Sequence, residues 1–205
     1  MRVFVAISPP EETKTVIGQL IADLRKNFPQ VKWEDPEKLH LTLAFLGMLV
    51  DEKVNTLKDI LREATPNFRA FELEIGDLSY FYKKHDDSII YLDVVDRSGE
   101  LKNFYQTLRH TLLERDIFLP DRIDPHISIG RVKRVRKVHV VKDILVDISR
   151  SEIPHIGNFI VNSANVYHSL FSRDDNSSNY HLLQSSHFSN SDENPVQTTD
   201  TDRES

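Results

Sequence analysis

Two short segments of this chain repeat one pattern, and the pattern constrains the fold more than any other feature. Residues 39–47 read LHLTLAFLG and residues 125–131 read PHISIGR, so each contains His, an apolar residue, a hydroxyl residue and another apolar residue. Alternation with a period of two is typical of a β-strand with one buried face. The sequence therefore predicts two such strands, far apart in the chain.

Each predicted strand presents an imidazole and a hydroxyl on one face, because successive side chains of a strand point to opposite faces. These are His40 and Thr42 in the first strand, and His126 and Ser128 in the second. A single His on an apolar strand is more often structural than catalytic, but two copies of one pattern indicate a shared reason. Two such strands that face each other form a site with two acid/base groups and two hydrogen-bond donors.

This set of groups suits the cleavage of a phosphodiester. A neutral imidazole can take a proton from the attacking oxygen while a protonated one gives a proton to the leaving oxygen, and a pKa of about 6.5 allows both forms at neutral pH. Thr42 and Ser128 would donate hydrogen bonds to the phosphoryl oxygens, where negative charge develops. This chemistry requires no metal and no cofactor.

Three features close to these strands are weaker candidates. Arg131 lies five residues after His126, so simple alternation places it on the opposite face unless Gly130 introduces a bulge or the strand ends there. Trp33 could stack on a base, although a lone Trp is more often a core residue. The basic run at 131–137 either attracts RNA phosphates or forms an exposed, solvated strand.

Composition limits the class of protein. With 205 residues, 39% of them hydrophobic, the chain can bury one substantial core, and one domain is expected. No apolar run approaches the roughly 18 residues of a membrane span, and residues 1–10 read as a first strand rather than a signal peptide. The absence of cysteine excludes disulfides and thiolate sites and suits a reducing compartment, so we expect a cytoplasmic protein.

The net charge of −6 comes mainly from the C-terminal residues, because 185–205 carry five acidic residues against one arginine. This segment is rich in Ser, Asn, Asp and Thr, and its apolar content is too low to offset the entropy of ordering it. We therefore expect a domain over residues 1–184 and a disordered acidic tail over residues 185–205. The nearly neutral remainder does not exclude an RNA substrate, since the local field matters more than the total charge.

The order of predicted elements indicates an α+β fold. Apolar residues with helical spacing predict helices at 10–28, 51–64 and 98–116. Strands are predicted at 39–46, 71–76, 88–95 and 124–132, with further short strands at 159–161, 165–170 and 180–183. Each His strand follows a helix, so a two-lobed body built from duplicated strand-helix-strand halves is expected.

These residues resemble a known family. The paired HLTL and HISI segments are similar to the signature of the 2H phosphoesterase superfamily. The opening strand, Trp33, the long first motif and the second motif through Arg131 resemble its RNA 2′,3′-cyclic phosphodiesterase branch, whose members are also called 2′-5′ RNA ligases. The resemblance covers about residues 1–183 in order.

The resemblance implies two lobes with antiparallel sheets flanking a central cleft, and one motif from each lobe. It implies metal-independent hydrolysis of a terminal 2′,3′-cyclic phosphate of RNA to a 2′-phosphate. We expect no cofactor and a monomeric protein. His40 would be the proton donor to the leaving 3′ oxygen and His126 the proton acceptor from water. Thr42, Ser128 and Arg131 would bind the phosphate of an RNA or nucleotide.

Three alternatives remain open from the sequence. The same fold could serve as a non-catalytic module that binds nucleotides or RNA ends. It could also act on another nucleotide phosphodiester, for example by ligation or cleavage of a 2′-5′ linkage. A third alternative is a scaffold whose tail recruits partners.

Overall fold

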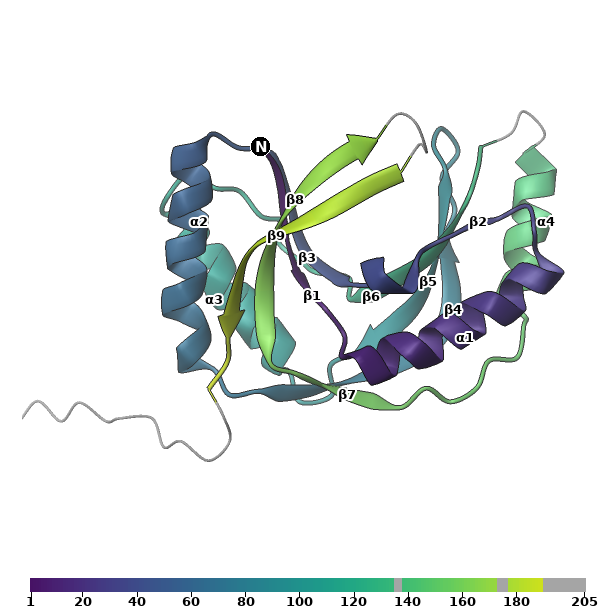
Figure 1. Ribbon diagram of the computed structural model, residues 1–205, viewed down its shortest axis with the longest axis horizontal. Helices are drawn as coiled ribbons and strands as arrows, with labels where there is room; N and C mark the ends of the chain where they lie inside the picture. Colours follow the sequence, from purple (N-terminus) through teal and green to yellow (C-terminus); the bar gives the residue numbers. More distant parts are fainter. Residues whose placement is uncertain (135–137, 173–176, 190–205) are drawn as a thin grey trace, which may run out of the picture.

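The computed structural model describes residues 1–134, 138–172 and 177–189, and in these residues nine strands form one sheet (Figure 1). The strands are β1 (Arg2–Ile7), β2 (Lys32–Trp33), β3 (Leu41–Met48), β4 (Phe71–Phe81), β5 (Ser88–Val95), β6 (His126–Val132), β7 (Asn158–Val161), β8 (Ser163–Ser172) and β9 (Ser177–His187). The helices are α1 (Glu11–Asn27), α2 (Asp51–Ala64), α3 (Glu100–Leu113) and α4 (Val138–Ser149), with short 3₁₀ turns η1 (Pro36–Lys38) and η2 (Thr65–Asn67).

The two predicted His strands are neighbours in the middle of the sheet. The strand order is β7-β4-β5-β6-β3-β1-β8-β9, with β2 beside β6. All pairs between named strands are antiparallel. Three strands (β1, β8 and β9) follow outward from β3 and three (β5, β4 and β7) from β6, so the halves are arranged alike. The α+β prediction and its duplicated halves are confirmed, and the halves share one continuous sheet.

Helices cover the sheet at both ends. In Figure 1, α2 and α3 lie over one half and α1 and α4 lie over the other. Helix α2 packs against α3 and β9, whereas α4 packs against β4. Helix α4 is not among the predicted helices, because its β-branched residues favour strands, although the buried Val141, Leu145 and Ile148 have helical spacing. No helix in the described part of the chain is long and apolar enough to cross a membrane.

A β-bulge interrupts β6 three residues after its His. The pairing with β5 moves from Ser128 to Gly130 between consecutive β5 residues, so Ile129 is an extra residue. Both Ile129 and Gly130 are buried, and the alternation is reversed beyond them. Arg131 consequently lies on the same face as His126. Simple alternation places it on the opposite face, and the bulge is what reverses this.

The same bulge occurs in β3. Its pairing with β1 moves from Thr42 to Ala44 between consecutive β1 residues, so Leu43 is extra. Leu43 and Ala44 are both buried, and Phe45 then turns to the face of His40, with its ring centroid 5.7 Å from that of Phe4. In both strands the extra residue is the third after the His, and this shared position is independent support for the duplication.

Trp33 belongs to the core. Its side chain is buried, and its indole N–H donates a hydrogen bond to the carbonyl of Phe28 at 3.1 Å. On the neighbouring strand, a Cβ atom added to Gly130 would lie 2.8 Å from Cε3 of Trp33. The core interpretation of Trp33 is therefore confirmed, and its close approach explains why Gly occupies position 130.

Residues 185–189 differ from the predicted tail. Strand β9 continues to His187, and Phe188 is buried, with ring centroids 5.3 Å from Phe71 and 4.9 Å from Phe104. The amide of Ser189 donates to the carbonyl of Phe68 at 2.9 Å. The sequence does not predict this extension, because all but one of its residues are polar and a single inward Phe is a weak signal. The remainder of the predicted tail, 190–205, lies outside the described residues.

We expect Phe188→Ala to lower the free energy of unfolding by about 3–5 kcal/mol, since it removes a buried ring and leaves a cavity. Chemical denaturation measures this value. The exposed neighbour His187 provides a control, because His187→Ala should change stability by less than about 0.5 kcal/mol. Equal effects of both substitutions would contradict the placement of Phe188 in the core.

We expect Gly130→Ala to lower the free energy of unfolding by about 1–3 kcal/mol, because the added methyl group overlaps the buried Trp33 ring. Thermal unfolding, together with Trp fluorescence, measures the loss and the displacement of the ring. At the exposed Gly47, a Cβ meets no atom within 4 Å, but φ is positive (+68°), so it is not a matched control. Wild-type stability and fluorescence in Gly130→Ala would contradict the close packing.

Candidate active site

One backbone pairing brings the two motifs together. Leu41 of β3 pairs with Ile127 of β6, and each of these residues directly follows the His of its motif. Both side chains are fully buried on one side of the sheet. The residues that flank them in each strand therefore point to the opposite side.

On that side, four predicted site residues form two cross-strand pairs. Extending the antiparallel register by one residue places His40 opposite Ser128, and Thr42 opposite His126. Side chains in such positions have Cβ atoms about 4.5–5.5 Å apart. We call the side of the sheet that carries these four residues the site face. All four side chains are partly exposed there.

The two imidazoles are oriented by matching contacts. Nδ1 of His40 lies 2.7 Å from the carbonyl oxygen of Lys38, and Nδ1 of His126 lies 2.7 Å from that of Asp124. A carbonyl only accepts, so Nδ1 carries the proton in both rings. Each Nε2 is then the atom that can accept or donate a proton during a reaction.

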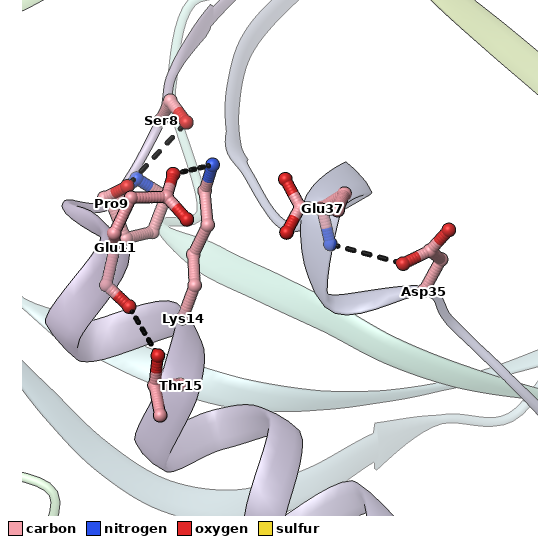
Figure 2. A network of polar contacts seen from close by, with 7 residues as sticks. All are labelled: Ser8, Pro9, Glu11, Lys14, Thr15, Asp35 and Glu37. Atoms are coloured by element: carbon pink, nitrogen blue, oxygen red, sulfur yellow. Dashed lines mark hydrogen bonds and ion pairs between the residues drawn. The ribbon is translucent and has the colours of Figure 1, made fainter.

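The chain leading into His40 is held by its own turn. Figure 2 shows the carboxylate of Asp35 accepting a hydrogen bond from the amide of Glu37 at 3.1 Å, which caps η1. Lys38, whose carbonyl orients His40, is the last residue of this turn. The position of His40 therefore depends on η1 as well as on β3.

Aromatic rings support both imidazoles. The ring of His40 lies 5.1 Å from that of Phe4 and 5.2 Å from that of Tyr180. The ring of His126 lies 5.1 Å from that of Phe81 and 5.2 Å from that of Tyr91. Packing of this kind restricts rotation of the imidazoles.

Burial lowers the pKa of His40, and the nearby His126 and Arg131 act in the same direction. The Lys38 carbonyl and the Glu34 carboxylate oppose this shift by favouring the charged ring. In the free protein, His40 is therefore more readily neutral than an ordinary histidine. A negatively charged ligand at the site face would favour its protonated form.

Arg131 has an acidic partner, Glu34, that is not among the predicted site residues. Its Nε lies 3.3 Å from the carboxylate of Glu34, and the amide of Glu34 donates to the carbonyl of Ile129 at 2.9 Å. Both charged groups are close enough to influence the pKa of His40. Glu34 directly follows the buried Trp33, and no motif marks it.

A carboxylate lies beside the second His. Asp93 of β5 pairs directly with His126. Burial raises the pKa of Asp93, the carboxylates of Asp124 and Asp77 raise it further, and His126 lowers it. Asp93 was also missed, because its strand shows only an apolar run.

A cavity of about 260 Å³ lies next to His40. Its walls include Phe4 and Ser8 from β1 and the following turn, and Tyr167, Asn179 and Tyr180 from β8 and β9. The basic run at 131–137 contributes exposed Lys133 and Arg134, while residues 135–137 lie outside the described residues. Among the residues that the structure describes, no group of three or more His, Asp or Glu side chains could hold a metal ion.

Comparisons with known proteins agree with this arrangement. The sequence model of the family described as "LigT like Phosphoesterase" matches residues 7–91, which include the first motif. A Thermotoga maritima protein named RNA 2′,3′-cyclic phosphodiesterase is 32% identical over 133 residues, covering 65% of this chain and 71% of that protein. A protein of the same name from Methanothermobacter thermautotrophicus is 23% identical and covers 75% of this chain and 83% of its own length.

Solved structures share the fold. The crystal structure of TT0787 from Thermus thermophilus has a TM-score of 0.72 at 19% identity, covering 92% of this chain and 98% of that one. E. coli LigT, crystallised with 3′-AMP, has a TM-score of 0.68 at 22% identity, covering 91% and 97%. With the family match, the T. maritima relative and two His motifs on one sheet face, the chain belongs to the LigT-like phosphoesterase family, also called 2H phosphoesterases.

Proposed function

We propose that this protein hydrolyses the terminal 2′,3′-cyclic phosphate of RNA to a 2′-phosphate, with His40 as proton donor and His126 as proton acceptor. The observation that carries the proposal is the Leu41–Ile127 pairing, which gathers two imidazoles and two hydroxyls on one face. The names of the T. maritima and M. thermautotrophicus relatives support the substrate. No cofactor is part of the proposal.

The proposed reaction needs one proton transfer at each imidazole. Neutral Nε2 of His126 takes a proton from a water molecule, whose oxygen forms a bond to phosphorus. The bond from phosphorus to the ribose 3′ oxygen breaks, and protonated Nε2 of His40 gives its proton to that oxygen. The product retains the phosphate on the 2′ oxygen, and proton exchange with solvent restores both rings.

The phosphate is held by the remaining predicted site residues. Thr42 and Ser128 lie opposite the two imidazoles and can donate hydrogen bonds to the non-bridging oxygens. Arg131, turned to the site face by the bulge in β6, provides a guanidinium for the same charge. Donors fixed in place before the reaction stabilise the charge that develops on these oxygens.

The role proposed for His40 requires its protonated form, although burial lowers its pKa in the free protein. The negative phosphate next to the ring favours the imidazolium, and Glu34 acts in the same direction. Binding of the substrate would therefore raise the pKa of His40 and favour the protonated ring that the proton donor requires.

The proposal also covers metal independence, oligomeric state and cellular location. Proton transfer by two imidazoles does not call on a metal, so activity should persist in EDTA. We also propose that the protein acts as a monomer. The cytoplasm is the proposed location, in keeping with a chain that contains no cysteine.

Product analysis tests the function. A short RNA with a 2′,3′-cyclic phosphate end is incubated with the protein and EDTA at neutral pH, and a 2′-phosphate product is expected. A 3′-phosphate product, or loss of activity in EDTA that added metal restores, would contradict the proposal. Binding without turnover would favour a non-catalytic module, and activity confined to 2′-5′-linked RNA would favour the other phosphodiester substrate.

We expect His40→Ala and His126→Ala each to reduce kcat/KM by about 100- to 10,000-fold, the usual contribution of a general acid or base. His110→Ala changes an exposed His on α3 and serves as the control. A reduction below tenfold in both site variants would remove the imidazoles from the mechanism.

An activated diester separates the two roles. The leaving group of bis(4-nitrophenyl) phosphate departs without needing a proton, so on this substrate His40→Ala should lose much less activity than His126→Ala. A greater loss in His40→Ala would assign the proton acceptor to His40 instead.

We expect the pKa of His40 in the free protein to lie below 6.5 and to rise when adenosine 2′-monophosphate binds. The sign follows from burial, which disfavours the charged ring, and from the phosphate charge, which favours it. NMR titration of the His40 ring with and without the nucleotide measures both values, and the exposed His181 is an internal reference. An unchanged or lowered value in the complex would mean that the phosphate does not lie against His40.

A further inference from the structure

Tyr180 of β9 covers His40, although the strand that carries it lies at the far end of the sheet order. Its ring centroid is 5.2 Å from that of His40 at 84°, and 5.0 Å from that of Phe4 at 73°. Phe4 is almost completely buried beneath these rings. Tyr180 also lines the cavity next to His40.

The hairpin that carries Tyr180 is tied to the segment before His40. Nζ of Lys38 donates a hydrogen bond to the side-chain oxygen of Asn179 at 3.0 Å. The carbonyl of the same lysine orients the His40 ring. One residue therefore fixes both the imidazole and the strand segment that covers it.

The other half of the sheet shows what packing alone requires. There the ring that lies nearly perpendicular to the imidazole is Phe81, at 79° to His126. One tyrosine of that half, Tyr91, is buried and stacks on Phe81 at 4.2 Å. At His126 a hydrocarbon ring makes this perpendicular contact, so contact with an imidazole does not by itself require the hydroxyl that Tyr180 carries.

Charged groups of the site influence this hydroxyl. Burial and the Glu34 carboxylate raise the pKa of Tyr180, whereas Arg131 and Arg2 lower it. Glu34 and Arg131 act on His40 as well. The phenol thus shares the neighbourhood of the imidazole and the guanidinium, and it is protonated at neutral pH, so it can donate a hydrogen bond.

We propose that the hydroxyl of Tyr180 donates a hydrogen bond to a non-bridging oxygen of the bound phosphate beside His40, making Tyr180 a catalytic residue supplied by the β8–β9 hairpin. This inference rests on the proposed function, which places the phosphate at the site face. Thr42, Ser128 and Arg131 come from the two His strands, and Tyr180 adds a donor from the side of the cavity.

Tyr180→Phe is the direct test, since it removes the hydroxyl and keeps the ring against His40. We expect kcat/KM for a nucleoside 2′,3′-cyclic phosphate to fall about 10- to 100-fold, the range for losing one hydrogen bond to a charged group. We also expect the affinity for inorganic phosphate, measured by calorimetry, to fall at least threefold. The control is His181→Ala, which changes the exposed next residue of β9 and should leave both values unchanged.

The NMR pKa of His40 in the phosphate-free protein provides a readout of packing. It should be the same in Tyr180→Phe as in the wild type, because the ring remains, and should rise in Tyr180→Leu, which opens the imidazole to water. Activity or phosphate affinity of Tyr180→Phe at the wild-type level would overturn the proposal. A changed His40 pKa in that variant would also overturn it, by assigning the loss to packing.

The two proposals can fail separately. A wild-type protein that releases no 2′-phosphate product contradicts the proposed function. The comparison of phosphate affinity between wild type and Tyr180→Phe still tests the hydroxyl in that case. A wild-type protein that does not bind inorganic phosphate at all overturns the inference as well.

Discussion

The backbone pairing of Leu41 with Ile127 is the contact on which the rest of the site depends. It joins the two halves of the molecule into one sheet and places both motifs at the join. Because the two strands are bonded to each other, the separation of the imidazoles is set by the spacing of a β-sheet and not by a loop or a domain hinge. Positioning of this kind is the main contribution that a rigid scaffold can make to proton transfer.

The two halves are alike in backbone and different in environment. Both imidazoles are held through Nδ1 by a carbonyl two residues earlier, and both follow the same bulge pattern. His40 is covered by Tyr180 and adjoins the cavity, whereas His126 lies opposite Asp93 of β5 in the sheet register. A symmetric frame with unlike surroundings suits a reaction in which one ring must give a proton and the other must take one.

The sequence was sufficient for the part of the site that follows from strand periodicity. Alternation alone placed His40 and Thr42 on one face, and repetition of the pattern paired them with His126. Alternation could not determine on which face of β6 Arg131 lies, since a bulge depends on how β5 pairs with β6. Glu34 directly follows β2 and Tyr180 lies in β9, and neither segment carries a motif; Phe188 is a single apolar residue in a polar stretch. These three were missed because only tertiary packing gives them a role.

Because of the bulge in β6, the number of residues between His126 and Arg131 determines which face of the sheet Arg131 occupies. Exchanging the intervening residues for others of suitable size would preserve which way the guanidinium faces. Removing one of them would restore regular alternation and send the positive charge toward the apolar interior, where an unpaired ion is costly. Among relatives of this protein, therefore, the length of this interval should be under stricter selection than its composition, and alignment gaps should be rare there.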